Sequence, residues 1–357
     1  MKKSLLAASV AFALGLPVSG MAESSSGEEA SAFDFDFYGS IRMQGEYVDP
    51  DDNSVEDDYF GFRDAYSRIG AKASYDTGAV TFFGHVESGL DLANFRVQGP
   101  YEQNDTAAHD EGQLWDHLRI AKVGISGDFG TLAYGQDWLP YYNAIAYPVD
   151  MFSTYYSGFA TYTAFRRNNT LAYYSPDWSG FSFSGGYSHE GGNLDSDGDP
   201  DDRYQLTASY TLGETTLSAG MDDLGGPDDT RIYGLSLMHT IENVGDGSIY
   251  VGAKAERFSS DTDDGYGEDG DTAVNLFASY AIGKHTFKGM VADVPEYGEN
   301  VFHAGYDYQL MEDLKVFAEY YYEEETAAIT TRRGGASDTL WAADGGQTVS
   351  VGFRYDF

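Results

Sequence analysis

The last nine residues of the chain, VSVGFRYDF, alternate strictly between apolar and polar side chains and end on an aromatic residue. Successive side chains in a β-strand point to opposite faces, so Val349, Val351, Phe353, Tyr355 and Phe357 share one face. Soluble chains usually end in a frayed polar tail instead. The pattern predicts a terminal strand with one face against an apolar medium and the other against water.

The same alternation recurs along the chain. In DFDFYGSIRMQGEY, Phe35 and Phe37 fall on one face, and Asp36 and Arg42 fall on the other. Charged residues on the second face indicate a wet lumen rather than a packed core. Sixteen segments are predicted as strands: 34–47, 62–77, 79–91, 114–126, 129–136, 167–175, 180–190, 203–212, 215–223, 231–241, 247–258, 271–283, 284–294, 299–310, 313–325 and 346–357.

The connections between these segments are of two kinds. Some are tight, such as DTG at 76–78 and IGKH at 282–285, whereas others are long and acidic, such as DPDDNSVEDD at 49–58. Short turns at one end, long loops at the other and an even number of strands are typical of an outer-membrane β-barrel. A large soluble sandwich or propeller is the alternative, but the sequence has no blade-length repeat.

Composition excludes several other classes. The 357 residues include 43 Gly, 29 Tyr, 22 Phe and no Cys, which favours β-structure with many turns and excludes disulfides and thiolate metal sites. The mean hydropathy is −0.41, and no segment beyond the N-terminal region approaches a hydrophobic helix. Among membrane-spanning folds this leaves the closed β-barrel, in which every backbone polar group inside lipid is paired.

Residues 1–22 have the layout of a cleaved secretory signal peptide. Two lysines precede a short apolar run, and the small residues Gly20 and Ala22 lie at positions −3 and −1 of a cut before Glu23. The run is shorter than the ~20 apolar residues that a spanning helix needs. We therefore expect residues 23–357 to form one exported barrel domain with a net charge of −39, against −37 for the whole chain.

Four motifs resemble, in their order and spacing, those of the general diffusion porins of the Gram-negative outer membrane: FYGSIRMQGEY, SRIGAK, VGISGDFGTLAYGQ and RRNNTLAYYSPDWSGFSFSGGY. The resemblance implies an all-β, sixteen-stranded antiparallel transmembrane barrel in the outer membrane, usually a homotrimer, that passes ions and small hydrophilic solutes by diffusion without a cofactor. Lipopolysaccharide and outer-membrane lipid would surround it, and no nucleic-acid partner is expected. The terminal aromatic residues resemble the signal that the barrel-assembly machinery reads: Phe353, Tyr355 and Phe357.

The resemblance also implies where the pore narrows. In this family a long loop folds inward, and here it would run over about 137–165. Basic residues on the barrel wall would face carboxylates on this loop. Carried over by motif, the wall residues are Arg42, Arg68, Arg166 and Arg119, with Lys72 close by, and the loop residues are Asp137, Tyr147 and Asp150. Arg119 and Lys122 are three residues apart, so both can face the lumen only if a bulge intervenes.

Two departures from the family pattern concern the pore. Gln136 stands where many relatives carry Arg, and Asn143 stands where several carry Asp. The loop is also rich in aromatic residues, which suggests a less polar constriction. External acidic loops would concentrate cations by focusing, whereas a basic constriction opposes them. We therefore expect weak cation selectivity at low salt that fades as salt screens the mouth.

Three other functions remain open. DSDGDPDD contains Asp195, Asp197 and Asp199, which resemble the start of a calcium loop but lack the closing Glu. An outer-membrane enzyme is disfavoured because neither G-x-S-x-G nor H-E-x-x-H is present. A substrate-specific channel, for sugars or another small solute, would use an aromatic slide. The loop tyrosines that could form one, or could simply pack the loop on the wall, are Tyr141, Tyr142, Tyr147, Tyr155 and Tyr156.

Overall fold

The computed structural model describes residues 32–51, 57–93, 95, 118–158, 161–189, 202–225, 229–261, 267–296, 298–324, 329 and 345–357. The predicted signal peptide (1–22) and the calcium candidates Asp195, Asp197 and Asp199 lie outside these residues. Within these ranges, no helix is both long and apolar enough to cross a membrane. The same ranges contain no group of three or more His, Asp or Glu side chains arranged to hold a metal ion.

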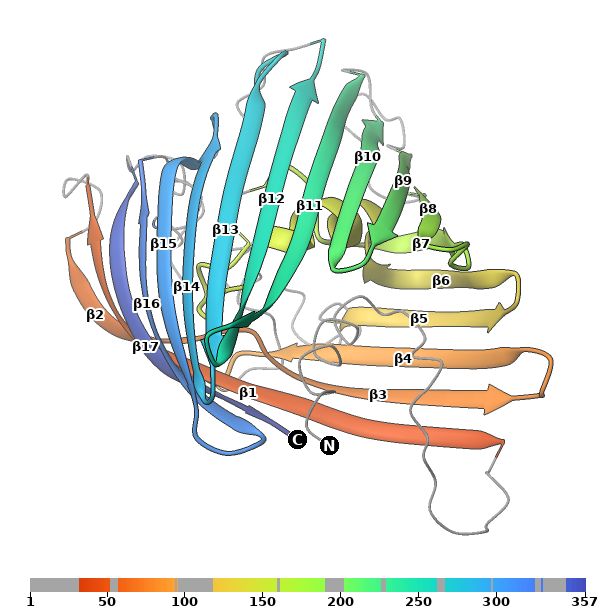
Figure 1. Cartoon of the computed structure of the whole chain (residues 1–357), viewed down its shortest axis with the longest axis horizontal. Coiled ribbons are helices and arrows are strands. Elements are labelled where there is room, and N and C mark those ends of the chain that lie inside the picture. The colour runs from red at the N-terminus through yellow and green to blue at the C-terminus, as the bar shows by residue number, and fades with distance from the viewer. Residues whose placement is uncertain are drawn as a thin grey trace.

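The described residues form one antiparallel sheet that curves until its last strand lies beside its first (Figure 1). Its strands are β1 (Phe33–Pro50), β2 (Tyr59–Asp64), β3 (Ser67–Asp76), β4 (Thr81–Leu90), β5 (Leu118–Gly127), β6 (Gly130–Trp138), β7 (Arg166–Tyr174), β8 (Phe181–Ser188), β9 (Arg203–Leu212), β10 (Thr215–Gly225), β11 (Thr230–Val244), β12 (Gly247–Ser259), β13 (Thr272–Ile282), β14 (His285–Val294), β15 (Gly298–Gln309), β16 (Leu314–Glu323) and β17 (Gly346–Asp356).

The barrel has sixteen strands because β2 and β3 are two halves of one. Both pair with β1, at successive stretches of its length. They are separated by Ala65 and Tyr66, and Tyr66 has a left-handed backbone with φ 69°. The predicted closed sixteen-stranded antiparallel barrel is therefore confirmed, with one break in its second strand.

The barrel closes at the C-terminal residue. Gly39 N donates to the Phe357 carbonyl at 2.8 Å, and Phe357 N donates to the Gly39 carbonyl at 3.0 Å. The Phe357 ring covers Gly39, where a Cβ atom would overlap it. A side chain at position 39 would therefore have to displace the Phe357 ring at the seam between β1 and β17.

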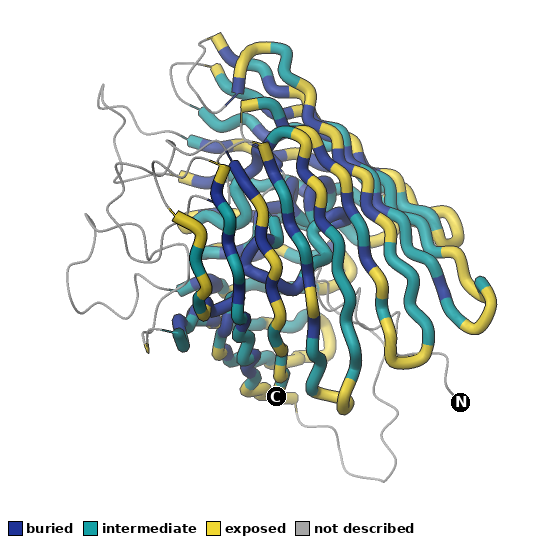
Figure 2. The backbone as a smooth tube through the Cα atoms, turned by 90° about the vertical axis from the view of Figure 1, so that its left-hand side faces the viewer, coloured by how far each residue is buried: buried dark blue, intermediate teal, exposed yellow. Residues whose placement is uncertain are grey.

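The alternation seen in the sequence separates two faces. The predicted apolar row of β17 points outward, with exposed fractions between 39% and 58%. Polar side chains such as Gln44, Lys254 and Glu256 are buried on the inner face. Exposed positions recur along the strands and gather at the turns in Figure 2. The polar face therefore lines the lumen, and the apolar face lies outside.

The connection between β6 and β7 leaves the wall and enters the lumen. Residues 139–165, of which 159 and 160 are not described, include two short helical turns, η3 (Tyr142–Ala146) and η4 (Tyr147–Val149). These turns contact β10, β11 and β12 on their inner faces. We call residues 139–165 the inner loop.

Candidate functional site

One side of the lumen carries basic and acidic side chains in matched pairs. It consists of β9, β10, β12, β14–β16 and the β1–β2 hairpin. The pairs are Arg63–Glu46 (3.0 Å), Arg203–Asp222, Lys254–Glu256 (2.5 Å), Lys288–Glu319 (2.9 Å) and Lys315–Asp307 (2.8 Å). We call these ten residues the docking wall, and their formal charges cancel.

The inner loop donates hydrogen bonds to the carboxylates of the docking wall. Four hydroxyl groups spread along the loop make these contacts. They are Tyr156 OH to Glu46 (3.1 Å), Thr154 Oγ1 to Glu319 (2.7 Å), Thr161 Oγ1 to Glu256 (3.0 Å) and Thr163 Oγ1 to Asp222 (2.7 Å). Each of these carboxylates thus binds both a wall cation and the loop, which fixes the loop along its length.

Glu319 is the most heavily bonded of these carboxylates. It accepts hydrogen bonds from the backbone N–H groups of Ser153 (2.8 Å) and Thr154 (3.1 Å), in addition to the Thr154 hydroxyl. Lys288 Nζ lies 2.9 Å away and His303 Nε2 lies 3.1 Å away. An ionised carboxylate can only accept hydrogen bonds, so it suits a site where five donors meet.

Two glycines allow the loop to approach the wall. The Pro148 carbonyl lies so close to Gly252 of β12 that a Cβ atom there would overlap it. Tyr141 lies equally close to Gly234 of β11. The Pro148 carbonyl, which faces Gly252, also accepts a hydrogen bond from Tyr250 OH at 2.8 Å. The sequence offered a signal here, because both glycines fall on the polar, inward-facing side of their strands.

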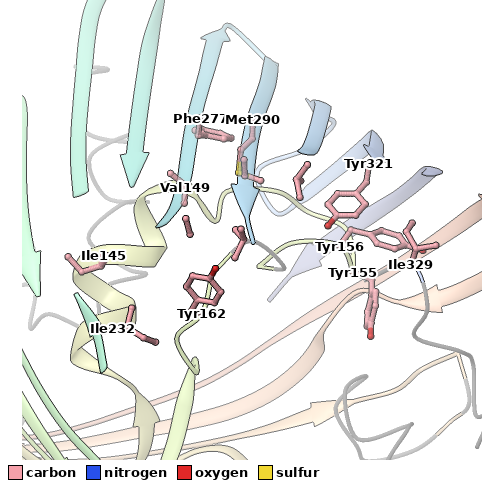
Figure 3. Packing of buried hydrophobic residues seen from close by; sticks show 14 of the residues in the cluster. Ile145, Val149, Tyr155, Tyr156, Tyr162, Ile232, Phe277, Met290, Tyr321 and Ile329 are labelled. Atoms are coloured by element: carbon pink, nitrogen blue, oxygen red, sulfur yellow. The ribbon is translucent and has the colours of Figure 1, made fainter. Parts of the chain in front are cut away.

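Apolar packing completes the attachment (Figure 3). Ile145, Val149 and Tyr162 of the loop lie against Ile232 and Phe277 of the wall, within one buried cluster. Tyr156 stacks on Tyr321 with ring centroids 5.3 Å apart. The tyrosines considered above for an aromatic slide are mostly buried in such contacts: Tyr141, Tyr142, Tyr155 and Tyr156, whereas Tyr147 is partly exposed.

The rest of the barrel wall carries an excess of arginine, which begins beside the docking wall, where Arg354 of β17 is the cross-strand partner of Lys315. Arg42 of β1, Arg68 of β3, Arg119 of β5, Arg166 of β7 and Arg354 of β17 are close enough to repel one another electrostatically. We call these five residues the arginine cluster. Within the part of the chain that the structure describes, two carboxylates pair with it: Glu87, at 2.9 Å from Arg119 and 3.7 Å from Arg68, and Asp356, at 2.7 Å from Arg354.

A bulge turns both predicted basic residues of β5 toward the lumen. Glu87 of β4 pairs with Ile120, but the next residue, Ser88, pairs with Leu118, so Arg119 is an extra residue in β5. Arg119 binds Glu87, and Lys122 Nζ lies 2.7 Å from Asp137. Because of this bulge, Arg119 and Lys122 both face the lumen although they are three residues apart.

The geometry is that of a water-filled barrel narrowed by an attached loop, and known proteins share it. The sequence model described as "Gram-negative porin" matches residues 6–328. The chain belongs to the Gram-negative porin family. The outer membrane porin protein 32 of Delftia acidovorans is 26% identical over 302 residues, covering 69% of this chain and 78% of that protein.

Solved porins have the same fold as this porin. The anion-selective porin from Comamonas acidovorans has a TM-score of 0.67 at 19% identity, covering 91% of this chain and 100% of that one. OmpF of Salmonella typhi, in complex with daunomycin, has a TM-score of 0.63 at 15% identity, covering 92% and 99%. The chain is thus an outer-membrane porin that forms a channel for passive diffusion.

The predicted wall residues of the porin mostly come together. Arg42, Arg68, Arg119 and Arg166 lie in one cluster, whereas Lys72 lies beside Tyr38, with its Nζ 4.9 Å from that ring's centroid. Arg354 joins the cluster although it was not among the predicted wall residues. Its place on the polar face of VSVGFRYDF was the available signal.

The predicted loop carboxylates do not pair with the arginine cluster. Asp137 lies in β6 rather than in the loop and pairs with Lys122, because the strand runs on to Trp138. Asp150 lies in the loop but accepts hydrogen bonds from Tyr142 OH and Ser157 Oγ, both at 2.5 Å. Burial, helped by Asp150, raises the pKa of Tyr142 well above its usual value, so this phenol remains a neutral donor.

The two residues that depart from the family pattern have local partners. Gln136 Nε2 donates to the Leu118 carbonyl, and Asn143 Nδ2 donates to Tyr174 OH at 3.5 Å. Neither carries a charge into the lumen. The excess positive charge on this side therefore comes from the arginine cluster.

Proposed function

We propose that the arginine cluster sets the ion preference at the narrowest part of this porin, and that it favours anions. The observation that carries the proposal is the imbalance of five arginines against two paired carboxylates. The five basic and five acidic residues of the docking wall cancel in formal charge, so they do not offset the excess of arginine. The anion-selective relative from Comamonas acidovorans is consistent with this reading.

The acidic external loops act on solutes before the arginine cluster does, and they favour cations where the cluster favours anions. We call the part of the channel beside the arginine cluster the eyelet. The carboxylates of the loops would attract cations to the channel entrance through their net negative charge. The Debye length is about 10 Å at 0.1 M salt and about 3 Å at 1 M, so salt screens the charges of the external loops sooner than those of the narrow eyelet. The porin should therefore pass cations slightly better at low salt and anions better at high salt.

Reversal potentials in planar bilayers test this proposal. With a fixed KCl ratio across the membrane and rising mean concentration, the chloride-to-potassium permeability ratio should increase. Arg42→Gln should lower the ratio at high salt on the order of twofold, since a unit charge at ~8 Å in water contributes about 0.5 kcal/mol. Lys284→Gln, which removes the same charge from the exposed turn between β13 and β14, is the matched control.

Two results would contradict the proposal. A permeability ratio that stays below one at every concentration would mean that the mouth dominates throughout. Equal effects of Arg42→Gln and Lys284→Gln would mean that selectivity follows total charge rather than the cluster. Chloride preference that is lost only in Arg42→Gln would support the eyelet.

The remaining features follow the family. We propose a homotrimer, as one structural neighbour, OmpT of Vibrio cholerae, is described in its trimer form. Residues 1–22 would be removed on export, and Phe353, Tyr355 and Phe357 would be read by the barrel-assembly machinery. Lipopolysaccharide would contact the outer rim. The protein would act as a channel without catalytic chemistry, and a specific sugar slide is disfavoured because four of the five tyrosines considered for it are buried.

A further inference from the structure

Arg166 is held against an aromatic ring and not beside a carboxylate. Its guanidinium carbon lies 4.4 Å from the ring centroid of Trp138, its cross-strand partner where the inner loop begins and ends. Among the described residues, the ion pairs of the arginine cluster join Glu87 and Asp356 to other members. Arg166 belongs to none of these pairs.

The Trp138 ring is itself fixed from the loop side. It stacks on Tyr142 with centroids 4.6 Å apart, and Phe165 packs at 6.4 Å. Tyr142 is buried and donates to Asp150 at 2.5 Å. The loop carboxylate, the tyrosine, the tryptophan and the arginine thus form one chain of contacts from the loop to the wall.

The partner of Arg166 matters because it determines how much of the positive charge of the guanidinium reaches the lumen. An indole face attracts a cation through its quadrupole but carries no net charge. A carboxylate would hold the same guanidinium and cancel its field. Arg119 and Arg68 repel Arg166, and Glu87 attracts it from the same cluster, so a long arginine side chain needs a direct contact to stay in one position.

We propose that Trp138 is the positioning residue that holds Arg166 at the constriction without a direct ion pair, so that its charge acts on passing solutes. The inference rests on the proposed anion preference of the arginine cluster and names the residue that maintains part of it. Asp150 acts on the same residue indirectly, since its hydrogen bond orients Tyr142 under the indole. Its role is to brace the ring stack, and it is not the counter-charge of the wall.

The test compares five variants of the mature protein by reversal potential near 1 M KCl, where salt screens the charges of the external loops. Arg166→Gln removes the charge, Trp138→Leu removes the aromatic face, and the third variant combines both. Trp138→Phe keeps a smaller aromatic face. Trp178→Leu, at an exposed tryptophan in the turn after β7, controls for the loss of a tryptophan elsewhere.

We expect Arg166→Gln and Trp138→Leu each to lower the chloride-to-potassium permeability ratio by a similar factor, on the order of twofold. The double variant should match Arg166→Gln alone, because an arginine that is absent cannot be mispositioned. Trp138→Phe should keep most of the original ratio, and Trp178→Leu should keep all of it. If Trp138→Leu does not assemble, Trp138→Met repeats the test with a flexible apolar side chain.

Different failures point to different claims. A lowered ratio in Arg166→Gln with an unchanged ratio in Trp138→Leu would overturn the positioning role alone. Additive effects in the double variant would overturn it too, since Trp138 would then act independently of Arg166. An unchanged ratio in both Arg166→Gln and Arg42→Gln would instead reject the basic eyelet itself.

Discussion

The two sides of the lumen use the same residue types for different purposes. On the docking wall every basic residue has a carboxylate partner, and the carboxylates also hold the loop. In the arginine cluster, Arg42 contacts Ser40 through a neutral hydroxyl, and Arg166 contacts the Trp138 ring. The paired charges of the docking wall hold the loop in place. The positive charges of Arg42 and Arg166 contact neutral groups instead, so they can still act on passing ions.

The difference has an energetic logic. Burying an ion pair gives little net stability, but removing one partner leaves a buried charge and costs several kcal/mol. The docking wall therefore tolerates change poorly. Arg42 of the arginine cluster is only partly buried and is repelled by Arg68, Arg354 and Arg119, so its loss relieves repulsion and costs little stability. Substitutions in the docking wall should therefore lower stability, and substitutions in the arginine cluster should mainly change ion selectivity.

Glu319→Ala should give the largest effect. It removes the nearest partner of the buried Lys288 ammonium, which keeps Asp307 at 3.1 Å, and leaves His303 and the two loop backbone N–H groups that bind Glu319 without their acceptor. We expect a loss of about 3–5 kcal/mol in the free energy of unfolding, measured by urea titration of the folded porin in lipid. Single-channel records should also become noisy, because the loop has lost a fixed point.

Arg42→Gln is the matched substitution on the other side. It should change the free energy of unfolding by less than about 1 kcal/mol while lowering chloride preference. Equal destabilisation by the two variants would show that the two walls do not differ in the way described. Normal stability of Glu319→Ala would show that the loop is held mainly by its apolar cluster.

Gly252→Ala should have an intermediate effect confined to the loop. The added Cβ would overlap the Pro148 carbonyl, and overpacking of this kind typically costs about 1–3 kcal/mol. The loop should shift away from β12, and the single-channel conductance should change. Gly289→Ala in β14 is the control, since a Cβ there meets nothing within 4 Å. A conductance change of the same size in both variants would mean that glycine loss acts through the barrel rather than through the loop.

The sequence predicted the strands and the orientation of their side chains, because both depend on the apolar/polar alternation and on the turn residues. Alternation identified the strands and placed Arg42, Arg68 and Arg166 on the inner face. It could not orient Arg119, because a bulge interrupts the period without a mark in the residues. Arg354 had the right parity but was not carried over by any motif.

The hydrogen bonds between the inner loop and the barrel wall could not be predicted from the sequence for a different reason. Thr161 and Glu256 are 95 residues apart and meet only because the barrel closes. Asp150 illustrates the consequence, since its position in the loop suggested a counter-charge for the wall. Its hydrogen bonds to Tyr142 and Ser157 belong instead to the internal structure of the loop. Which carboxylate binds which donor follows from the closed shape and not from local pattern.

The smallest expected effect concerns Tyr147, the one partly exposed tyrosine of the six in the inner loop. Burial, with a contribution from Asp150, raises its pKa to about 12. An ordinary tyrosine with a pKa near 10 would be half ionised at pH 10 and would place negative charge beside the arginine cluster. Tyr147 should stay neutral there, so Tyr147→Phe and the unmodified porin should show the same reversal potential at every pH from 7 to about 10. Any drift caused by lysines would appear in both proteins. A fall in chloride preference in this range that is absent from Tyr147→Phe would mean that the phenol ionises, and that this part of the loop adds its own charge to a side of the lumen otherwise governed by arginine.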